Sequence, residues 1–321
     1  MIPRRTLLAA AALAPFAAHA QSWAPSRPLR FVVPFVAGGS TDVAARIIAD
    51  HMSQSLGQPV IVENRGGSGG NIGGDIVAKA PPDGHTLLMG VTGLLSTNQH
   101  IYPTMSFDVA RDLAPVSMAY TSDMVIVVTN RLPARTLREF VALARQRPGA
   151  MSFGSSGHGA STHTAAELFK LQAGIDVVHV PYRGSGGAMN DLIAGNIEMM
   201  LVQIAATVDA IQGNQIRALA VTGPQRHALL PEIETVTEAG WPGATATSWG
   251  CVMVPGPTPQ PAIARLHQAV SAAIADAGVQ ARLAGAGVDG LASTPEELAA
   301  FLVSEREKWG RVVREARIRV E

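Results

Sequence analysis

Three glycine-rich loops each follow a predicted strand and lead into a predicted helix. They are Pro34–Asp42, Arg65–Asn71 and Gly154–Thr162. Such a loop places backbone N–H groups and short hydroxyls at a helix N-terminus, where unpaired donors and the helix dipole attract an anion. Glycine also lets the backbone approach a ligand closely. The loops predict a carboxylate site, while an ordinary turn capped by Ser or Thr remains the alternative for any single loop.

Glycine-rich loops also occur in nucleotide sites and around the nucleophile of serine hydrolases. The loops contain no G-x-x-x-x-G-K-[ST] motif, and Gly157–Thr162 misses the last glycine of the dinucleotide fingerprint, which argues against a nucleotide. Gly66–Gly70 matches the G-x-S-x-G pattern of a serine nucleophile, but three residues separate it from the preceding strand and no Asp and His stand out as partners. A secreted hydrolase that uses Ser68 stays open as an alternative.

Side chains that bind metals or charges give weaker signals. His158 and His163 are five residues apart, a spacing that does not put both rings on one helix face, so no metal site and no cofactor are expected. His163 falls in the first turn of a predicted helix, where it can bond a ligand or a neighbouring loop. Arg183 is either a solvated loop charge or a counter-charge to a carboxylate.

The N-terminal residues have the pattern of an export signal. Arg4 and Arg5 precede an apolar run, Leu7–Ala18, that is too short to span a bilayer, and Ala18–Ala20 is a small-x-small cleavage site. We expect a signal peptide over residues 1–20, with the twin-arginine and general export routes both open. Lys plus Arg and Asp plus Glu each number 25, and this balance argues against a nucleic-acid partner.

Short β-rich runs alternate with helical patterns along the chain, which predicts an α/β fold with parallel strands. Thr136 and Thr294 each begin a capping box, so helices are expected from there. The predicted strands are 29–33, 60–62, 86–91, 125–129, 151–154, 177–180, 217–222 and 249–254. The predicted helices are 42–56, 71–80, 136–145, 161–173, 187–194, 261–277 and 295–314.

Several motifs, in order, resemble the Bug-type, TctC-like receptors of tripartite tricarboxylate transporters. They are Pro34–Asp42, Val62–Arg65, Gly69–Gly73, Ala80–Gly84, His179–Gly184, Arg217–Thr222 and Ser293–Glu297. The resemblance covers essentially the whole mature chain. It implies a type II periplasmic binding protein, a Venus flytrap whose two lobes each have a mixed, mainly parallel sheet flanked by helices. Two chain crossings would join residues 21–123 plus 249–321 to residues 124–248.

The resemblance also implies which positions meet the ligand in the cleft. They are Phe35, Ala37, Gly38, Gly39, Ser40, Thr41, Asp42, Gly93, Ser155, Ser156, Thr162, His163, Tyr182, Gly184 and Gln203. One departure bears on specificity, because many members have Asp-Asn where this chain has Val202 and Gln203. An ammonium buried without a carboxylate partner is costly, so a carboxylate without an amino group is expected.

These features predict a monomeric, periplasmic receptor that is not an enzyme. An open cleft would bind the carboxylate, the lobes would close by a hinge motion, and the closed form would dock on a membrane permease. A sensor that presents its closed form to a signalling partner uses the same cleft, so the partner remains open.

Overall fold

The computed structural model describes residues 23–319. The predicted signal peptide, 1–20, lies outside the described residues. Within residues 23–319, no helix combines the length and the apolar character needed to cross a bilayer.

The first of two sheets contains both ends of the described chain. Its strands are β1 (Leu29–Val33), β2 (Val60–Asn64), β3 (Thr86–Val91), the first part of β4 (Leu113–Thr129), β9 (Thr247–Pro255) and β10 (Asp289–Gly290). Strand β1 lies between β2 and β3 and is parallel to both, whereas β9 is antiparallel to β3 and to β4. Alternate residues of β1 enter opposite apolar cores: Phe31 packs in one and Val32 in the other.

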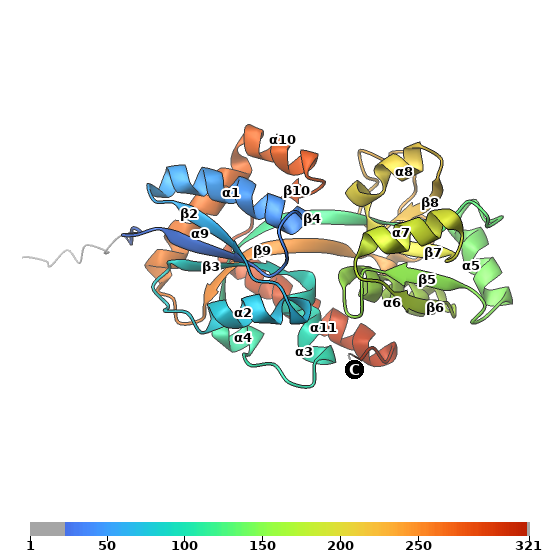
Figure 1. Ribbon diagram of the computed structural model, residues 1–321, viewed down its shortest axis with the longest axis horizontal. Helices are drawn as coiled ribbons and strands as arrows, with labels where there is room; N and C mark the ends of the chain where they lie inside the picture. Colours follow the sequence, from blue (N-terminus) through green and yellow to red (C-terminus); the bar gives the residue numbers. More distant parts are fainter. Residues whose placement is uncertain (1–22, 320–321) are drawn as a thin grey trace, which may run out of the picture.

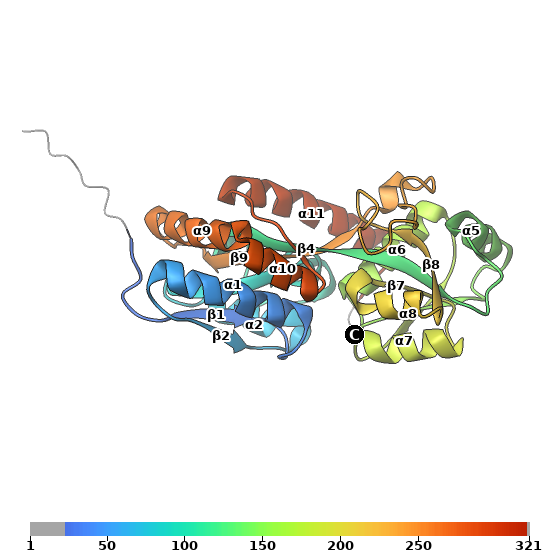
Figure 2. The same ribbon diagram turned by 90° about the horizontal axis from the view of Figure 1, so that it is seen from above.

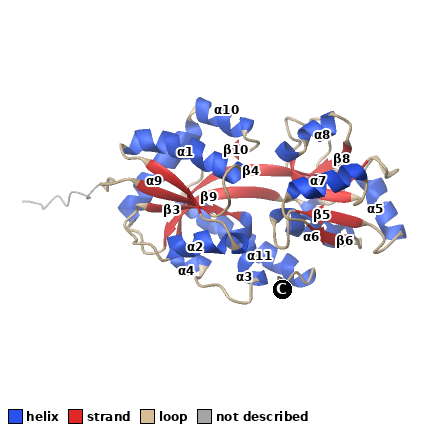
Figure 3. Ribbon diagram, in the orientation of Figure 1, coloured by secondary structure: helices blue, strands red, loops and turns tan. Residues whose placement is uncertain are grey.

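The second sheet is built around the second part of β4. Its other strands are β5 (Ser152–Ser155), β6 (Val178–Pro181), β7 (Met199–Gln203) and β8 (Ile216–Val221). Strands β5, β6 and β7 are mutually parallel, while β4 is antiparallel to both β7 and β8. Both sheets are therefore mixed and form the two lobes seen in Figure 1 and Figure 3.

Helices cover both faces of each sheet (Figure 1). Around the first sheet lie α1 (Ser40–Leu56), α2 (Asn71–Ala78), α3 (Asn98–Ile101), α4 (Val109–Asp112), α9 (Gln260–Ala275), α10 (Ala277–Gly285) and α11 (Pro295–Glu315). Around the second lie α5 (Leu137–Gln146), α6 (Ser161–Ala173), α7 (Ser185–Ala194) and α8 (Val208–Gln212). Short helical turns also occur at η1 (Ser68–Gly70), η2 (Gly93–Thr97), η3 (Ile204–Ala206) and η4 (Pro242–Ala244).

Strands β4 and β9 run between the lobes as neighbours (Figure 1). Leu113–Asp123 pairs with β9, and from Met124 onward β4 pairs with β7 and β8. The predicted boundaries, 123/124 and 248/249, lie inside these two strands. How the two units move relative to each other stays a prediction.

Most predicted elements agree with the structure to within a few residues. The main omission is the first half of β4, where Pro115 and bulges near Ser117 and Tyr120 obscure the strand pattern. The predicted helix over 261–277 ends earlier, because Asp276 adopts an extended conformation and caps α10 by accepting a hydrogen bond from the Val279 N–H.

Helix α11 connects the two lobes by packing rather than by chain crossing. Its first half contributes Leu298 and Leu302 to a core of the first lobe. Its last turns contribute Trp309 and Val312 to the core of the second lobe, although the predicted boundaries assign all of 249–321 to the first. Figure 2 shows α11 reaching from one lobe toward the other.

A buried carboxylate holds this helix against β9. Both Glu305 and the indoles of Trp249 and Trp309 are buried, and each indole N–H donates to Glu305 Oε2, at 2.8 and 2.7 Å. The Lys308 ammonium lies 3.6 Å from Glu305 Oε1. Because both indole N–H groups donate to the buried carboxylate, we infer that Glu305 stabilises the folded protein.

Replacing Glu305 by alanine would leave two buried indole N–H groups without acceptors. We expect Glu305→Ala to lower the free energy of unfolding by about 2–4 kcal/mol, measured by urea denaturation. Glu307→Ala, at an exposed position of the same helix, is the matched control and should leave the midpoint unchanged. Equal midpoints for the two variants would show that the Glu305 contacts contribute nothing.

Candidate functional site

A cavity of about 460 Å³ lies between the two lobes. Residues of both lobes and of both crossing strands line it. Its lining consists of Phe35, Ser40, Thr41, Gly69, Val91, Thr92, Gly93, Asn98, Tyr102, Tyr120, Ser122, Ser156, Gly157, His158, Gly159, Ala160, Ser161, Ser185, Gln203 and Ser248. Among residues 23–319, this lining includes no Asp, Glu, Lys or Arg, and most of its polar side chains are hydroxyls and amides.

Three helices begin at this cavity: α1 with Ser40, α6 with Ser161 and α7 with Ser185. Their N-cap residues are Gly39, Ala160 and Gly184, which have no polar side chain to cap the first turn. By contrast, α5, α10 and α11 are capped by Thr136, Asp276 and Thr294. The first N–H groups of the helices at the cavity therefore remain available to an anion.

The crossing strands contribute hydroxyls to the cavity. Tyr120 and Ser122 come from β4, and Ser248 comes from β9. The Tyr120 hydroxyl lies 3.0 Å from Thr41 Oγ1, which ties α1 to the crossing strand. Burial raises the pKa of Tyr120 to about 12, so this phenol stays neutral and can donate a hydrogen bond.

Part of the cavity lining comes from residues that the sequence did not predict: Gly69, Asn98 and Tyr102. Asn98 is buried, and its Nδ2 donates to the Gly69 carbonyl at 3.0 Å and to Asn71 Oδ1 at 2.7 Å. Gly69 has a φ of 63°, and a Cβ there would lie 2.8 Å from the Tyr102 hydroxyl. These residues come together only through folding, and nothing in their spacing signals a shared site.

The predicted binding positions fall into two groups. Six line the cavity: Phe35, Ser40, Thr41, Gly93, Ser156 and Gln203. Nine do not: Ala37, Gly38, Gly39, Asp42, Ser155, Thr162, His163, Tyr182 and Gly184. Several members of the second group hold the lining loops in place from behind.

Asp42 organises the first loop from a buried position. Its carboxylate accepts the Gly38 N–H and the Asn64 Nδ2–H, both at 2.9 Å, and pairs with Arg46 at 3.0 Å. Burial alone would raise the pKa of Asp42, but the Arg46, Gly38 and Asn64 contacts outweigh it and lower the pKa below its usual value. Asn64 also donates to the Phe35 carbonyl at 3.1 Å, so the acid positions the loop that lines the cavity.

The loop of the second lobe is held in a similar way. Thr162 Oγ1 accepts the Ser156 N–H at 2.9 Å, and the Gly184 N–H donates to the Ser156 carbonyl at 3.2 Å. Tyr182 turns away, because its hydroxyl donates to Asp191 at 2.6 Å. Ser156 is thus fixed from both sides, while Thr162 and Gly184 act as its supports.

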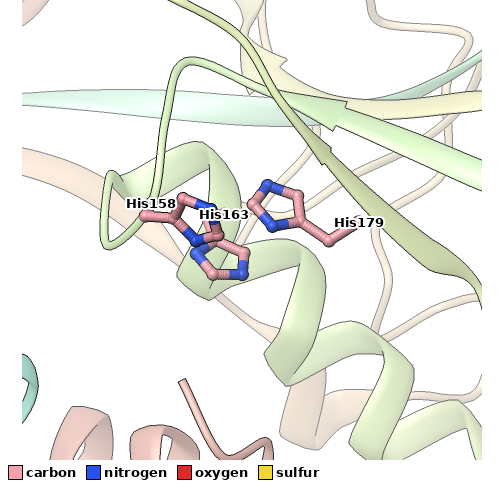
Figure 4. A group of neighbouring side chains, drawn as sticks. All are labelled: His158, His163 and His179. Atoms are coloured by element: carbon pink, nitrogen blue, oxygen red, sulfur yellow. The ribbon is translucent and has the colours of Figure 1, made fainter. Parts of the chain in front are cut away.

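Three histidines gather beside this loop (Figure 4). The rings of His163 and His179 stack with centroids 3.8 Å apart, and His158 lies edge-on to both. Burial, followed by the neighbouring imidazoles, lowers the pKa of His163 to about 3; burial, then His158 and Lys170, lowers that of His179 to about 4. The spacing argument against a metal treated His158 as helical, whereas it precedes α6 and meets His179 from β6.

Val202 does not face the ligand cavity, contrary to the prediction from the sequence. Val202 is fully buried in an apolar core and is absent from the cavity lining, while its neighbour Gln203 faces the cavity. Gln203 Nε2 donates to Ser161 Oγ at 3.4 Å. The described lining contains no acidic side chain that could pair with an ammonium.

Arg183 and Ser68, for which the sequence allowed a functional role as an alternative, are not part of the cavity lining. Arg183 is exposed, which fits a solvated loop charge. Ser68 is also exposed, and although its φ of 48° is unusual for a serine, no hydrogen bond joins it to a histidine among residues 23–319. Ser68 therefore lacks, among the described residues, the histidine partner that a serine nucleophile needs.

A family model and a relative of known sequence both match this chain over most of its length. Residues 44–318 match the model of the tripartite tricarboxylate transporter family receptor, TctC. Protein BugT of Bordetella pertussis is 36% identical, with 91% of this chain and 90% of BugT covered.

Two solved structures from Rhodopseudomonas palustris have the same fold. Rpa4515 with adipate has a TM-score of 0.81 and 34% identity, covering 92% of this chain and 99% of that one. MatC with bound malate has a TM-score of 0.78 and 30% identity, covering 90% and 99%.

Proteins of this family are periplasmic solute-binding receptors and not enzymes, so the hydrolase alternative based on Ser68 is set aside. The protein belongs to the TctC family, the Bug-type receptors of tripartite tricarboxylate transporters.

Proposed function

We propose that this receptor captures a small carboxylate without an ammonium group in the cavity between its lobes. The observation that carries the proposal is the convergence of three helix N-termini, begun by Gly39, Ala160 and Gly184, on a cavity whose described lining has no Asp, Glu, Lys or Arg. Oriented backbone N–H groups attract an anion without any formal positive charge. A carboxylate then accepts several hydrogen bonds at once.

The size and lining of the cavity favour a compact dicarboxylate. About 460 Å³ is within the range of small-molecule sites. Hydroxyls of Thr41, Tyr120 and Ser248 lie on the first-lobe side and the crossing strands, while Ser156 and Ser161 lie in the second lobe. Two carboxyl groups would engage both lobes together. The similar structures of Rpa4515 and MatC contain adipate and malate, respectively, and both ligands are dicarboxylates without an amino group.

Capture would precede delivery to a membrane partner. A ligand bonded to both lobes favours the closed arrangement by the difference in its affinity for the two states. We propose that the closed form docks on the permease of a tripartite tricarboxylate transporter after export of the chain through a signal peptide over residues 1–20. A signalling partner that reads the same closed form is the second candidate.

A thermal-shift screen of the tag-free mature chain tests the ligand class. Mono-, di- and tricarboxylates are each paired with the corresponding amino acid. Ligand at about a hundred times its dissociation constant adds about 2.7 kcal/mol and raises the midpoint by several degrees. We expect dicarboxylates to shift the midpoint more than their amino-acid partners. A larger shift with the amino acids, or none with any carboxylate, contradicts the proposal.

The Thr41 hydroxyl gives a test of the site itself. Thr41→Val keeps the side-chain shape but removes the partner of Tyr120 and one hydroxyl of the cavity. We expect a roughly tenfold loss of dicarboxylate affinity by calorimetry, about 1.4 kcal/mol, because one bond to a charged group is lost. Thr104→Val, at an exposed position outside the lining, serves as the control. Matching affinities in the two variants would place the ligand elsewhere.

Asp42 gives the site a predictable response to pH. Because the folded protein lowers its pKa, the stabilisation that Asp42 provides is present above its usual pKa of 3.8 and is lost as pH falls through the lower, folded value. We expect Asp42→Asn to weaken dicarboxylate binding at pH 7. The asparagine amide has only one oxygen, so its NH2 group would face either the Gly38 N–H or the Asn64 NH2, two donors that each need an acceptor. The variant should also lose less further affinity than wild type below about pH 4. Parallel pH profiles for the two proteins, measured by calorimetry, would refute this role.

A further inference from the structure

We propose that His158 and His179 form a binding site for a divalent transition-metal ion, such as Zn²⁺ or Ni²⁺, in the wall of the ligand cavity. Imidazole nitrogen is a preferred ligand of these ions. His158 and His179, with His163 beside them, each offer a ring nitrogen, and these three atoms all lie within 4.8 Å of one another. Figure 4 shows the three rings in one group, drawn from the β5–α6 loop, α6 and β6.

Ring orientation decides which pair can share an ion. His163 and His179 are nearly parallel, with 10° between their planes, so their in-plane lone pairs cannot both point at one ion. His158 is nearly perpendicular to His179, at 88°, with centroids 5.1 Å apart. Two imidazoles on a tetrahedral ion, with metal–nitrogen bonds of about 2.0–2.1 Å, have centroids about 5.2 Å apart. The perpendicular pair therefore has suitable spacing and the stacked pair does not.

Hydrogen bonds select His179 over His163 as the partner of His158. His163 Nδ1 accepts the Gly159 N–H at 3.0 Å, so the neutral ring carries its proton on Nε2 and has no free lone pair. His179 Nε2 lies 2.6 Å from Ser155 Oγ, whose proton goes to the Gly157 carbonyl at 3.2 Å. In the tautomer that carries its proton on Nε2, His179 donates to Ser155 Oγ and its Nδ1 is free. A hydrogen bond from the second ring nitrogen is the usual support of a metal-binding histidine.

The immediate surroundings suit a neutral imidazole. Lys170, the cation facing this group, pairs with Glu167 at 2.8 Å and lies over the Phe153 ring. His158 is exposed between Gly157 and Gly159, whose positive φ values of 137° and 72° favour glycine.

Two protein ligands leave further coordination positions open. Because His158 lines the cavity, a carboxylate held there can supply oxygen ligands to the ion. Metal and dicarboxylate would then each raise the affinity for the other by the same factor. This coupling rests on the proposed function, whereas the metal site itself does not.

Titration of the tag-free chain with Zn²⁺ or Ni²⁺ tests the site, with a chromogenic chelator as competitor. We expect one ion per chain and at least a tenfold weaker affinity in His158→Ala. His267→Ala, a partly buried histidine of α9 outside the cluster, is the matched control and should bind as wild type does. The same affinity in His158→Ala as in wild type, or no binding by the wild-type chain, overturns the proposal.

A spectroscopic measurement and a ligand titration complete the test. Co²⁺ in the site should show visible absorption bands that are lost in His158→Ala and kept in His267→Ala. Bands that persist in His158→Ala would overturn the assignment. Malate and adipate are then titrated with the metal present and with a chelator. Dicarboxylate binding with no metal binding refutes this inference and leaves the proposed function standing, whereas metal binding with no carboxylate binding refutes the proposed function and not the metal site.

Discussion

The antiparallel pairing of β4 with β9 is the constraint on which the rest of the structure depends. The pair extends from Leu113 with Pro255 to Asp123 with Thr247, and beyond it β4 alone continues into the second sheet. Because residues two apart on a strand face the same side, Tyr120 and Ser122 of β4 both line the cavity, and Ser248 of β9 pairs with Ser122 there. One ladder of backbone hydrogen bonds thus fixes the lobes, the connection between them and part of the binding surface.

The proposed site would attract an anion by the geometry of its backbone rather than by side-chain charge. The chain carries 25 basic and 25 acidic residues. The carboxylate of Asp42, behind the cavity lining, pairs with Arg46 and accepts hydrogen bonds from the Gly38 N–H and the Asn64 amide. A glycine or alanine at the N-cap costs a helix some stability, because its first N–H groups lack a side-chain partner. At Gly39, Ala160 and Gly184 a bound carboxylate would supply the missing acceptor, so the ligand would complete the fold locally.

The sequence predicts the local parts of this design and misses the contacts made at long range. The glycines of Pro34–Asp42 and the helical pattern that follows them predict a loop before a helix. Thr294 predicts the start of α11. Asn98 and Tyr102 meet Gly69 across about thirty residues, and His179 meets His158 through β6, so no local pattern marks them. Val202 shows the opposite error, because a position beside a binding residue in a strand faces the other side of the sheet.

Helix α11 limits how the lobes can move. Its C-terminal turns pack Trp309, Val312 and Val313 against the second lobe, while Glu305 bonds Trp249 on the crossing strand. On the other side, a Cβ at Gly287 of the first lobe would lie 1.9 Å from that of Ala205 in the second, so the lobes already touch there. The proposed closing motion would therefore have to carry the end of α11 with the second lobe and bend β4 and β9 between these contacts. The bulges of β4 beside Ser117 and Tyr120 interrupt the ladder next to the cavity, where bending disturbs the fewest paired groups.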